Sequence, residues 1–132
     1  MSEPSAPEGS PPPIVVGYSA KPEGRAALKR ALAEAELHDA ELIVLHPAPE
    51  PELAALRAEL AASGVRYEVR GATDTHDPAE DLLNAAESSG AEFIVIGLRR
   101  RSSVGKLLLG SNAQRVLLDA SCPVLAVKAE SD

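Results

Sequence analysis

The fold is decided by residues 92–128, which read EFIVIGLRRRSSVGKLLLGSNAQRVLLDASCPVLAVK. An apolar run at 92–97 is followed by a polar connection, a segment with helical spacing at 111–119, and a second apolar run at 123–128. Two such runs joined by a helix are typical of parallel strands, because parallel pairing needs a long crossover connection. The stretch therefore predicts one strand–helix–strand unit of an α/β protein.

The same alternation of apolar runs and helical spacing continues upstream. It predicts further strands at 14–18, 41–46 and 65–70, with helices at 23–38, 52–62 and 78–88. The runs IVV, LIVL and FIVI are apolar throughout, as expected of parallel strands that are covered on both faces. We therefore predict an α/β three-layer sandwich around a mostly parallel, five-stranded sheet.

Composition limits both the size and the partners of this domain. The 132 residues are 45% hydrophobic and 25% charged, which predicts one folded domain. A net charge of −7 argues against binding to nucleic acid or to an anionic membrane. No run approaches the ~18 apolar residues of a membrane span, and the start has no secretory pattern. The single cysteine, Cys122, excludes an intramolecular disulfide, so we expect a cytoplasmic protein.

The first thirteen residues differ from the rest of the chain. They contain five of its eleven prolines and no large apolar residue beyond Met1. Such a segment buries too little surface to offset its ordering entropy. We predict a disordered, proline-rich tail at 1–13 and a folded domain at 14–130.

Ligands of open parallel sheets bind beyond the carboxyl ends of the strands. The connection after the strand at 92–97 spans residues 98–110, which is long for a compact domain. It carries four cations and ends in a small-residue helix cap: Arg99, Arg100, Arg101, Lys106, and then Gly110-Ser111-Asn112. Free amides at a helix start and nearby guanidinium groups suit a phosphate. The alternative is a solvated basic loop with an ordinary cap. Neither GxxxxGK[ST] nor GxGxxG occurs.

Three segments together resemble the universal stress protein family: IVVGYS ahead of PEGRAALKRAL, AELIVLH, and residues 94–128. The resemblance covers nearly all of 14–128. It implies an adenine nucleotide alpha hydrolase-like fold with strand order 3-2-1-4-5. It also implies a bound adenine nucleotide (ATP or AMP) and a homodimer through the last strand, 123–128. Lys128 and Glu130 would oppose that strand pairing.

The family's loop pattern is Gly, two residues, Gly, nine residues, then Gly and Ser or Thr. Gly97 and Gly110-Ser111 match it, whereas Arg100 replaces the second glycine. Ser19 stands where nucleotide-binding members carry Asp, and Pro47 where they carry Val. The resemblance implies two groups of site residues, one for phosphates and one for base and sugar: Gly97, Arg100, Gly110, Ser111 and Asn112; Gly17, Tyr18, Ser19, His46 and Pro47.

The resemblance implies a stress-response sensor or regulator, and we expect no catalytic residue and no metal site. Two alternatives remain open. One is a dimeric interaction module that binds no nucleotide, as in another branch of the family. The other is a slow nucleotide hydrolase, which would need Asp74, His76 or Asp77 to reach the crevice.

Overall fold

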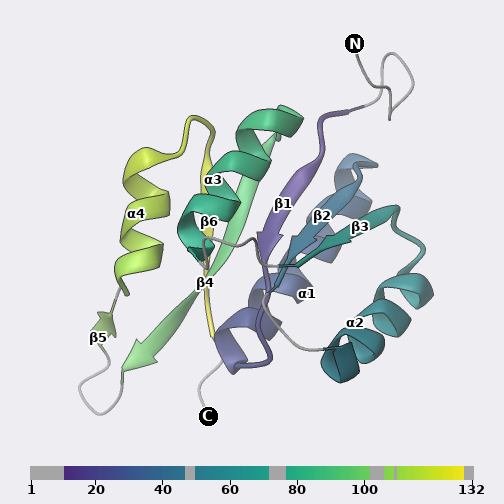
Figure 1. Ribbon diagram of the computed structural model, residues 1–132, viewed down its shortest axis with the longest axis horizontal. Helices are drawn as coiled ribbons and strands as arrows, with labels where there is room; N and C mark the ends of the chain where they lie inside the picture. Colours follow the sequence, from purple (N-terminus) through teal and green to yellow (C-terminus); the bar gives the residue numbers. More distant parts are fainter. Residues whose placement is uncertain (1–10, 47–49, 72–76, 102–105, 109, 130–132) are drawn as a thin grey trace.

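The computed structural model describes residues 11–46, 50–71, 77–101, 106–108 and 110–129. Its strands lie side by side in the centre, with helices in front of and behind them (Figure 1). The elements, in chain order, are β1 (Ile14–Gly17), α1 (Pro22–His38), β2 (Leu42–Leu45), α2 (Glu50–Ser63), β3 (Tyr67–Arg70), α3 (Pro78–Ser89), β4 (Phe93–Arg101), β5 (Lys106–Leu108), α4 (Ser111–Asp119) and β6 (Val124–Lys128).

The sheet confirms the predicted strand order. Five parallel strands run β3-β2-β1-β4-β6, so that β6, the last strand of the chain, takes the fifth place. Val15 lies opposite Ile43 on one side and Ile94 on the other. The strands with unbroken apolar runs are therefore the central ones, where side chains on both faces leave water.

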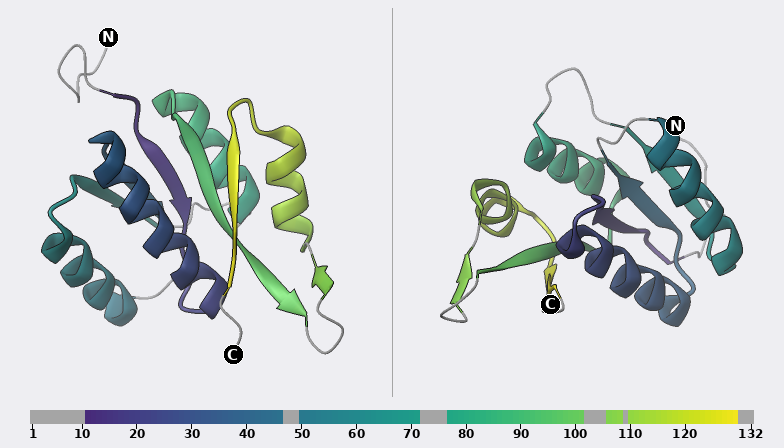
Figure 2. Two further views of the ribbon diagram at one scale, coloured as in Figure 1. Left: turned by 180° about the vertical axis from the view of Figure 1, so that it is seen from behind. Right: turned by 90° about the horizontal axis from the view of Figure 1, so that it is seen from below.

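Each face of the sheet has its own aliphatic core. Beneath α1 and α2 lie Val16, Val44 and Val95, all buried. Beneath α3 and α4 lie Val15, Ile43 and Ile94. Burial of each such side chain stabilises the fold by about 1.5–3 kcal/mol. Figure 2 (right) shows the two helix layers on opposite sides of the sheet, as the sandwich prediction requires.

β3 shows why its sequence alternates. Tyr67 and Val69 pack toward α1 and α2, whereas Glu68 and Arg70 take the other face and form an ion pair of 2.7 Å between Oε2 and Nε. Among the described residues β3 pairs only with β2. It is the edge strand that its half-polar pattern predicts.

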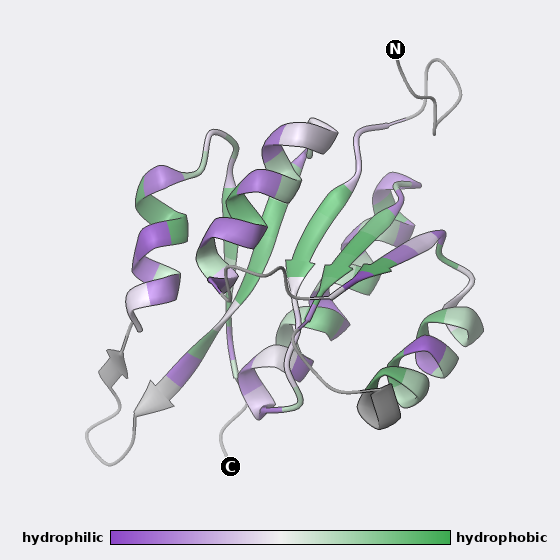
Figure 3. Cartoon of the chain, in the orientation of Figure 1, coloured by the Kyte–Doolittle hydropathy of each residue, from purple (hydrophilic) through white to green (hydrophobic). Residues whose placement is uncertain are grey.

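The prediction of a long loop at 98–110 is wrong for part of that range. β4 continues to Arg101, and Arg99–Arg101 pair in antiparallel fashion with β5. The strand turns from hydrophobic to hydrophilic beyond the core (Figure 3). The polar side chains of Arg99–Arg101 suggested a loop. However, β6 pairs with β4 as far as Leu98, and β5 pairs with Arg99–Arg101. Hydrogen bonding to neighbouring strands, rather than burial, thus sets the length of β4.

Most of the predicted tail, 1–13, lies outside the described residues. Its last residue, Pro13, accepts a hydrogen bond of 2.7 Å from the amide of Glu92. The described chain thus joins the sheet one residue ahead of β1. No described helix is both long enough and apolar enough to cross a membrane.

Candidate functional site

The parallel register brings the carboxyl ends of the strands together at one end of the sheet. This end of the sheet is called here the carboxyl edge. Gly17 at the end of β1 lies opposite Leu45, and Leu45 lies opposite Arg70. The next residues stay attached, because the amide of Tyr18 donates to Leu45 (2.8 Å) and that of His46 to Arg70 (3.1 Å). Gly17, Tyr18 and His46 are therefore neighbours, as the sequence predicts.

Two of these neighbours turn their side chains inward. Tyr18 is 9% exposed and belongs to the core beneath α1 and α2. His46 is 4% exposed, the buried polar residue of the described chain. Both side chains thus lie inside the fold beneath the carboxyl edge and leave their backbone as the part nearest that edge. Pro47 lies outside the described residues.

Ser19 holds the start of α1. Its Oγ accepts a hydrogen bond of 3.3 Å from the amide of Lys21. It also packs so closely on Gly24 that a methyl group at that glycine would overlap Ser19. The serine that replaces the family's Asp therefore forms a local turn, with its hydroxyl at the carboxyl edge.

Gly97 has a packing role that the loop pattern did not suggest. A methyl group at this position would overlap the backbone carbonyl of Glu23, in the first turn of α1. Arg99, two residues further along β4, lies 3.7 Å from the Glu23 carboxylate (Nε to Oε2). The absence of a side chain at Gly97 therefore admits the first turn of α1, which fills that space.

α4 begins with an open N-terminus. Gly110 occupies the N-cap position in an extended conformation (φ −66°, ψ 167°), and no side chain caps the helix. No acidic residue lies in the first turn, and Gly110, Ser111 and Asn112 are all exposed. The first amides of a helix have no partner within it and carry partial positive charge. The amides of this helix end can therefore donate hydrogen bonds to an anion.

α3 begins in the opposite way. Asp77 caps it by accepting from the amide of Glu80 (3.2 Å), and Glu80 and Asp81 place carboxylates in the first turn. Arg115 of α4 donates to Asp77 Oδ2 (2.8 Å) and also to Glu80. The Arg115 guanidinium, aided by the Glu80 amide, lowers the pKa of Asp77 from its ordinary value. Sequence reasoning named Asp77 only as a residue that a hydrolase would need, and it missed Arg115, because the partners of Arg115 are distant in the chain.

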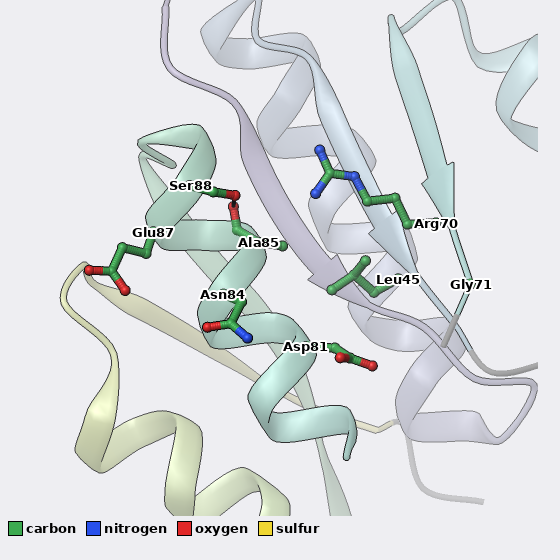
Figure 4. Close-up of a pocket in the computed structure, with 8 residues that line it drawn as sticks. All are labelled: Leu45, Arg70, Gly71, Asp81, Asn84, Ala85, Glu87 and Ser88. Atoms are coloured by element: carbon green, nitrogen blue, oxygen red, sulfur yellow. Dashed lines mark hydrogen bonds between the residues drawn. The ribbon is translucent and has the colours of Figure 1, made fainter. Parts of the chain in front are cut away.

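A pocket of about 480 Å³ opens beside α3 at the carboxyl ends of β2 and β3. Leu45 and Ala85 supply apolar lining, and the remaining lining residues are polar or glycine: Arg70, Gly71, Asp81, Asn84, Glu87 and Ser88. Figure 4 shows the Arg70 guanidinium reaching from β3 toward α3, while Glu87 points away from it. The pocket offers donors and acceptors around a small apolar floor.

The remaining predicted residue, Arg100, lies in the part of β4 that pairs with β5, opposite Leu107. The described residues contain no group of three or more His, Cys, Asp or Glu side chains placed to hold a metal ion. Burial raises the pKa of the Cys122 thiol, which favours its protonated, unreactive form. The chemistry on offer at the carboxyl edge is anion and hydrogen-bond recognition.

Comparison with known proteins points to one family. A model of the universal stress protein family matches residues 12–66 and 50–128. A universal stress protein from Mycolicibacterium smegmatis is 46% identical over 126 residues, which cover 87% of this chain and 96% of the relative.

Solved structures agree with the sequence match. A universal stress protein from Archaeoglobus fulgidus superposes with a TM-score of 0.72 at 30% identity, covering 88% of this chain and 98% of that one. A universal stress protein from the same organism, solved in complex with dAMP, gives a TM-score of 0.66 at 26% identity, covering 90% and 99%.

Proposed function

The chain belongs to the universal stress protein family, and on that premise we propose that it binds an adenine nucleotide, ATP or AMP, at the carboxyl edge of its sheet. In this proposal the protein is a stress-response sensor or regulator in the cytoplasm. The relative solved with dAMP supports the ligand class. The nucleotide would lie with its phosphates at the start of α4 and its base toward α3.

The open N-terminus of α4 carries the proposal. Ser111 and Asn112 present free amides behind Gly110, with no carboxylate in the first turn. An anion at such a position is stabilised by the amides and by the helix dipole, typically by about 0.3–1 kcal/mol for each charge at a surface. A phosphate that accepts two or three of these amide bonds gains more, since each bond to a charged group contributes about 1.5–3 kcal/mol.

The pocket beside α3 supports placement of the base. Its volume of about 480 Å³ falls within the usual range for small-molecule sites, about 300–1,000 Å³. Leu45 and Ala85 would contact the ring faces, and Asn84 offers both a donor and an acceptor at the rim. The Ser19 hydroxyl would hydrogen-bond the sugar where other members use Asp.

We propose binding rather than efficient hydrolysis. Of the three residues named for a hydrolase, only Asp77 is described, and its carboxylate caps α3 and pairs with Arg115. A group committed to two partners is a poor general base, because its pKa is lowered and proton transfer needs a free lone pair.

A dimeric interaction module without nucleotide remains the second candidate. It is favoured by β6, which in the described chain pairs with β4 alone and so leaves one side unpaired. Exposed strand edges are commonly covered by another chain. A homodimer through 123–128 is compatible with either candidate, so the ligand is what separates them.

One experiment decides between the two candidates. The purified protein is denatured, and any released small molecule is identified by mass spectrometry. ATP and AMP are then titrated into nucleotide-free protein by calorimetry. We expect bound adenine nucleotide or a saturating heat signal. The absence of both at millimolar ligand would refute nucleotide binding and leave the interaction module.

Arg100→Glu tests the residue that replaces the second glycine of the loop pattern. Loss of a charge-assisted phosphate contact of about 1.5–3 kcal/mol predicts affinity roughly ten- to a hundredfold weaker. Arg57→Glu is the control, because it makes the same charge change on an exposed residue of α2. Equal affinities in the two variants would show that Arg100 does not contact phosphate.

A further inference from the structure

A second group of cations lies along α1 and at the end of β6. Lys21, Arg25 and Lys29 recur at every fourth residue, which places them along one side of the helix. Arg30 lies beside Lys29, and Lys128 ends β6. Figure 2 (left) shows the start of α1 next to the end of β6. In a chain with a net charge of −7, this is a local reversal of sign.

Most of these cations have no ion-pair partner among the described residues. Arg30 is paired with Glu34 at 2.8 Å, but Arg25, Lys29 and Lys128 form no ion pair with any other described residue. Two like charges four residues apart on a helix destabilise it by a few tenths of a kcal/mol. This is about as much as a pair of opposite charges stabilises it. The fold therefore gains nothing from this arrangement.

Four of these cations, Arg25, Lys29, Arg30 and Lys128, border a groove of about 780 Å³, called here the basic groove. Between them lie small apolar surfaces, contributed by Pro22, Ala26, Ala33 and Val127. One acidic residue, Glu59 of α2, also lines it. A groove with an apolar floor and cationic rims fits an extended or helical segment that presents carboxylates beside small apolar side chains.

The opposite helix layer is acidic. On α3 and α4, and at the α3 cap, the described residues contribute one cation, Arg115, and five acids: Asp77, Glu80, Asp81, Glu87 and Asp119. The excess of cations on the other side is confined to the basic groove, because α1 itself also carries Glu23, Glu34 and Glu36. An acidic partner is attracted to the basic groove and repelled by the layer of α3 and α4, which favours one orientation.

We infer that the basic groove is a docking surface for an acidic segment of a partner protein. The apolar floor favours a protein over a nucleic acid, because a phosphate backbone has no side chains to bury there. Net negative charge also disfavours long polyanions. The basic groove shares no residue with the proposed nucleotide site, so the inference stands whether or not nucleotide binds.

The test uses the full chain and a defined probe. The probe is an acetylated and amidated peptide, ELAEELAEEL, and its control is the same peptide with every Glu replaced by Gln. At 13.7 kDa the protein suits amide-resolved NMR titration. We expect the acidic peptide to shift the amides of Ala26, Lys29, Ala33 and Val127, and the Gln peptide to leave them unmoved.

Two double variants with equal charge change make the result specific. Arg25→Glu/Lys29→Glu removes the rim of the basic groove, whereas Arg57→Glu/Arg66→Glu changes exposed cations outside it. Each surface charge pair contributes about 0.2–1 kcal/mol, and reversal replaces attraction by repulsion. We expect roughly tenfold weaker peptide binding, about 1.4 kcal/mol, for the first variant. The second should change affinity less than about twofold.

Three results would overturn the inference. Equal loss in the two double variants would show that only net charge matters. Equal binding of the Glu and Gln peptides would show that carboxylates are not recognised. Stronger shifts at the same amides with a single-stranded DNA oligonucleotide would make this a nucleic-acid surface. Calorimetry with AMP on Arg25→Glu/Lys29→Glu separates this test from the nucleotide proposal, because that affinity should not change.

Discussion

α3 and α4 cover the same face of the sheet, yet their N-termini are built in opposite ways. α3 begins at Asp77, which caps its first turn, and carries Glu80 and Asp81 next to the helix start. α4 begins at Gly110 with no side-chain cap and no acidic residue in its first turn. The partial positive charge of the helix start is thus stabilised by the chain's own carboxylates at α3. At α4 no carboxylate of the first turn does so, and an external anion can take this place.

The comparison shows which helix end is free to bind phosphate. At α3 a phosphate would meet carboxylates that are already in place, and repulsion would cancel what the amides offer. Arg115 reinforces the difference. It lies in the middle of α4, and its guanidinium pairs with Asp77 and Glu80 at the start of α3 rather than with an anion at the start of α4. The Arg115 contacts also join the two helices, so that the start of α4 is held relative to α3.

Making α4 resemble α3 should have the largest effect. In Gly110→Asp/Asn112→Glu, carboxylates occupy the place proposed for phosphate. Two such charges ~4 Å apart repel by about 4 kcal/mol at an effective dielectric constant near 20. We expect a loss of roughly thirtyfold or more in AMP affinity, about 2 kcal/mol, measured by calorimetry. The melting temperature should not fall, since acidic residues favour a helix start.

Ser121→Glu is the matched control, because it adds a carboxylate at an exposed residue beyond the other end of α4. Its AMP affinity should equal that of the wild type. If the two variants lose affinity alike, charge in general weakens binding, and the start of α4 has no special role.

Removing the α3 cap should reduce stability more than affinity. Asp77→Ala deletes both the cap of Glu80 and the ion pair with Arg115, whereas Asp77→Asn keeps an oxygen that can cap. Asp119→Ala removes only a long contact of 3.9 Å to Arg115. Thermal melting should rank the losses as Asp77→Ala, Asp77→Asn, then Asp119→Ala. A loss in Asp119→Ala equal to that in Asp77→Ala would contradict the role of the cap.

The pH dependence of this difference is the smallest effect. The pKa of Asp77 is lowered in the folded protein, chiefly by Arg115. A carboxylate whose pKa is lower in the folded than in the unfolded protein stabilises the fold at any pH above its unfolded pKa. This stabilisation is lost as the pH falls through its folded pKa. The melting-temperature gap between wild type and Asp77→Asn should therefore be full at pH 7 and close as the pH falls below about 4. A gap that stays constant to pH 2.5 would show that charge on Asp77 does not contribute.

The five parallel strands and the four helices could be predicted along the chain because each depends on a local pattern, whereas the order of the strands in the sheet was implied by the family resemblance. Unbroken apolar runs such as Leu42–Leu45 identify central strands, and alternation at Tyr67–Arg70 identifies an edge. The cap at Asp77 also has a local signal, an acceptor directly ahead of Pro78. Such features need no knowledge of what lies across the fold.

The rest depends on contacts between distant segments. Gly97 fits the family's loop pattern, yet its neighbour in space is Glu23, from a segment more than seventy residues earlier. Arg99–Arg101 look like a loop by polarity and form a strand because β5 returns beside them. Arg115 looks like one more exposed cation on α4. Its partners at the start of α3 appear only once the two helices are packed together.

The most direct measurement records backbone amide shifts by NMR while AMP is added to the nucleotide-free protein. The central claim is that the open start of α4, and not the capped start of α3, holds the phosphate. We predict large, saturable shifts for Ser111, Asn112 and Ala113, with Ala79 and Glu80 nearly unmoved. Saturable binding that shifts Ala79 and Glu80 and leaves the amides at the start of α4 in place would contradict the claim, as would no binding at millimolar AMP.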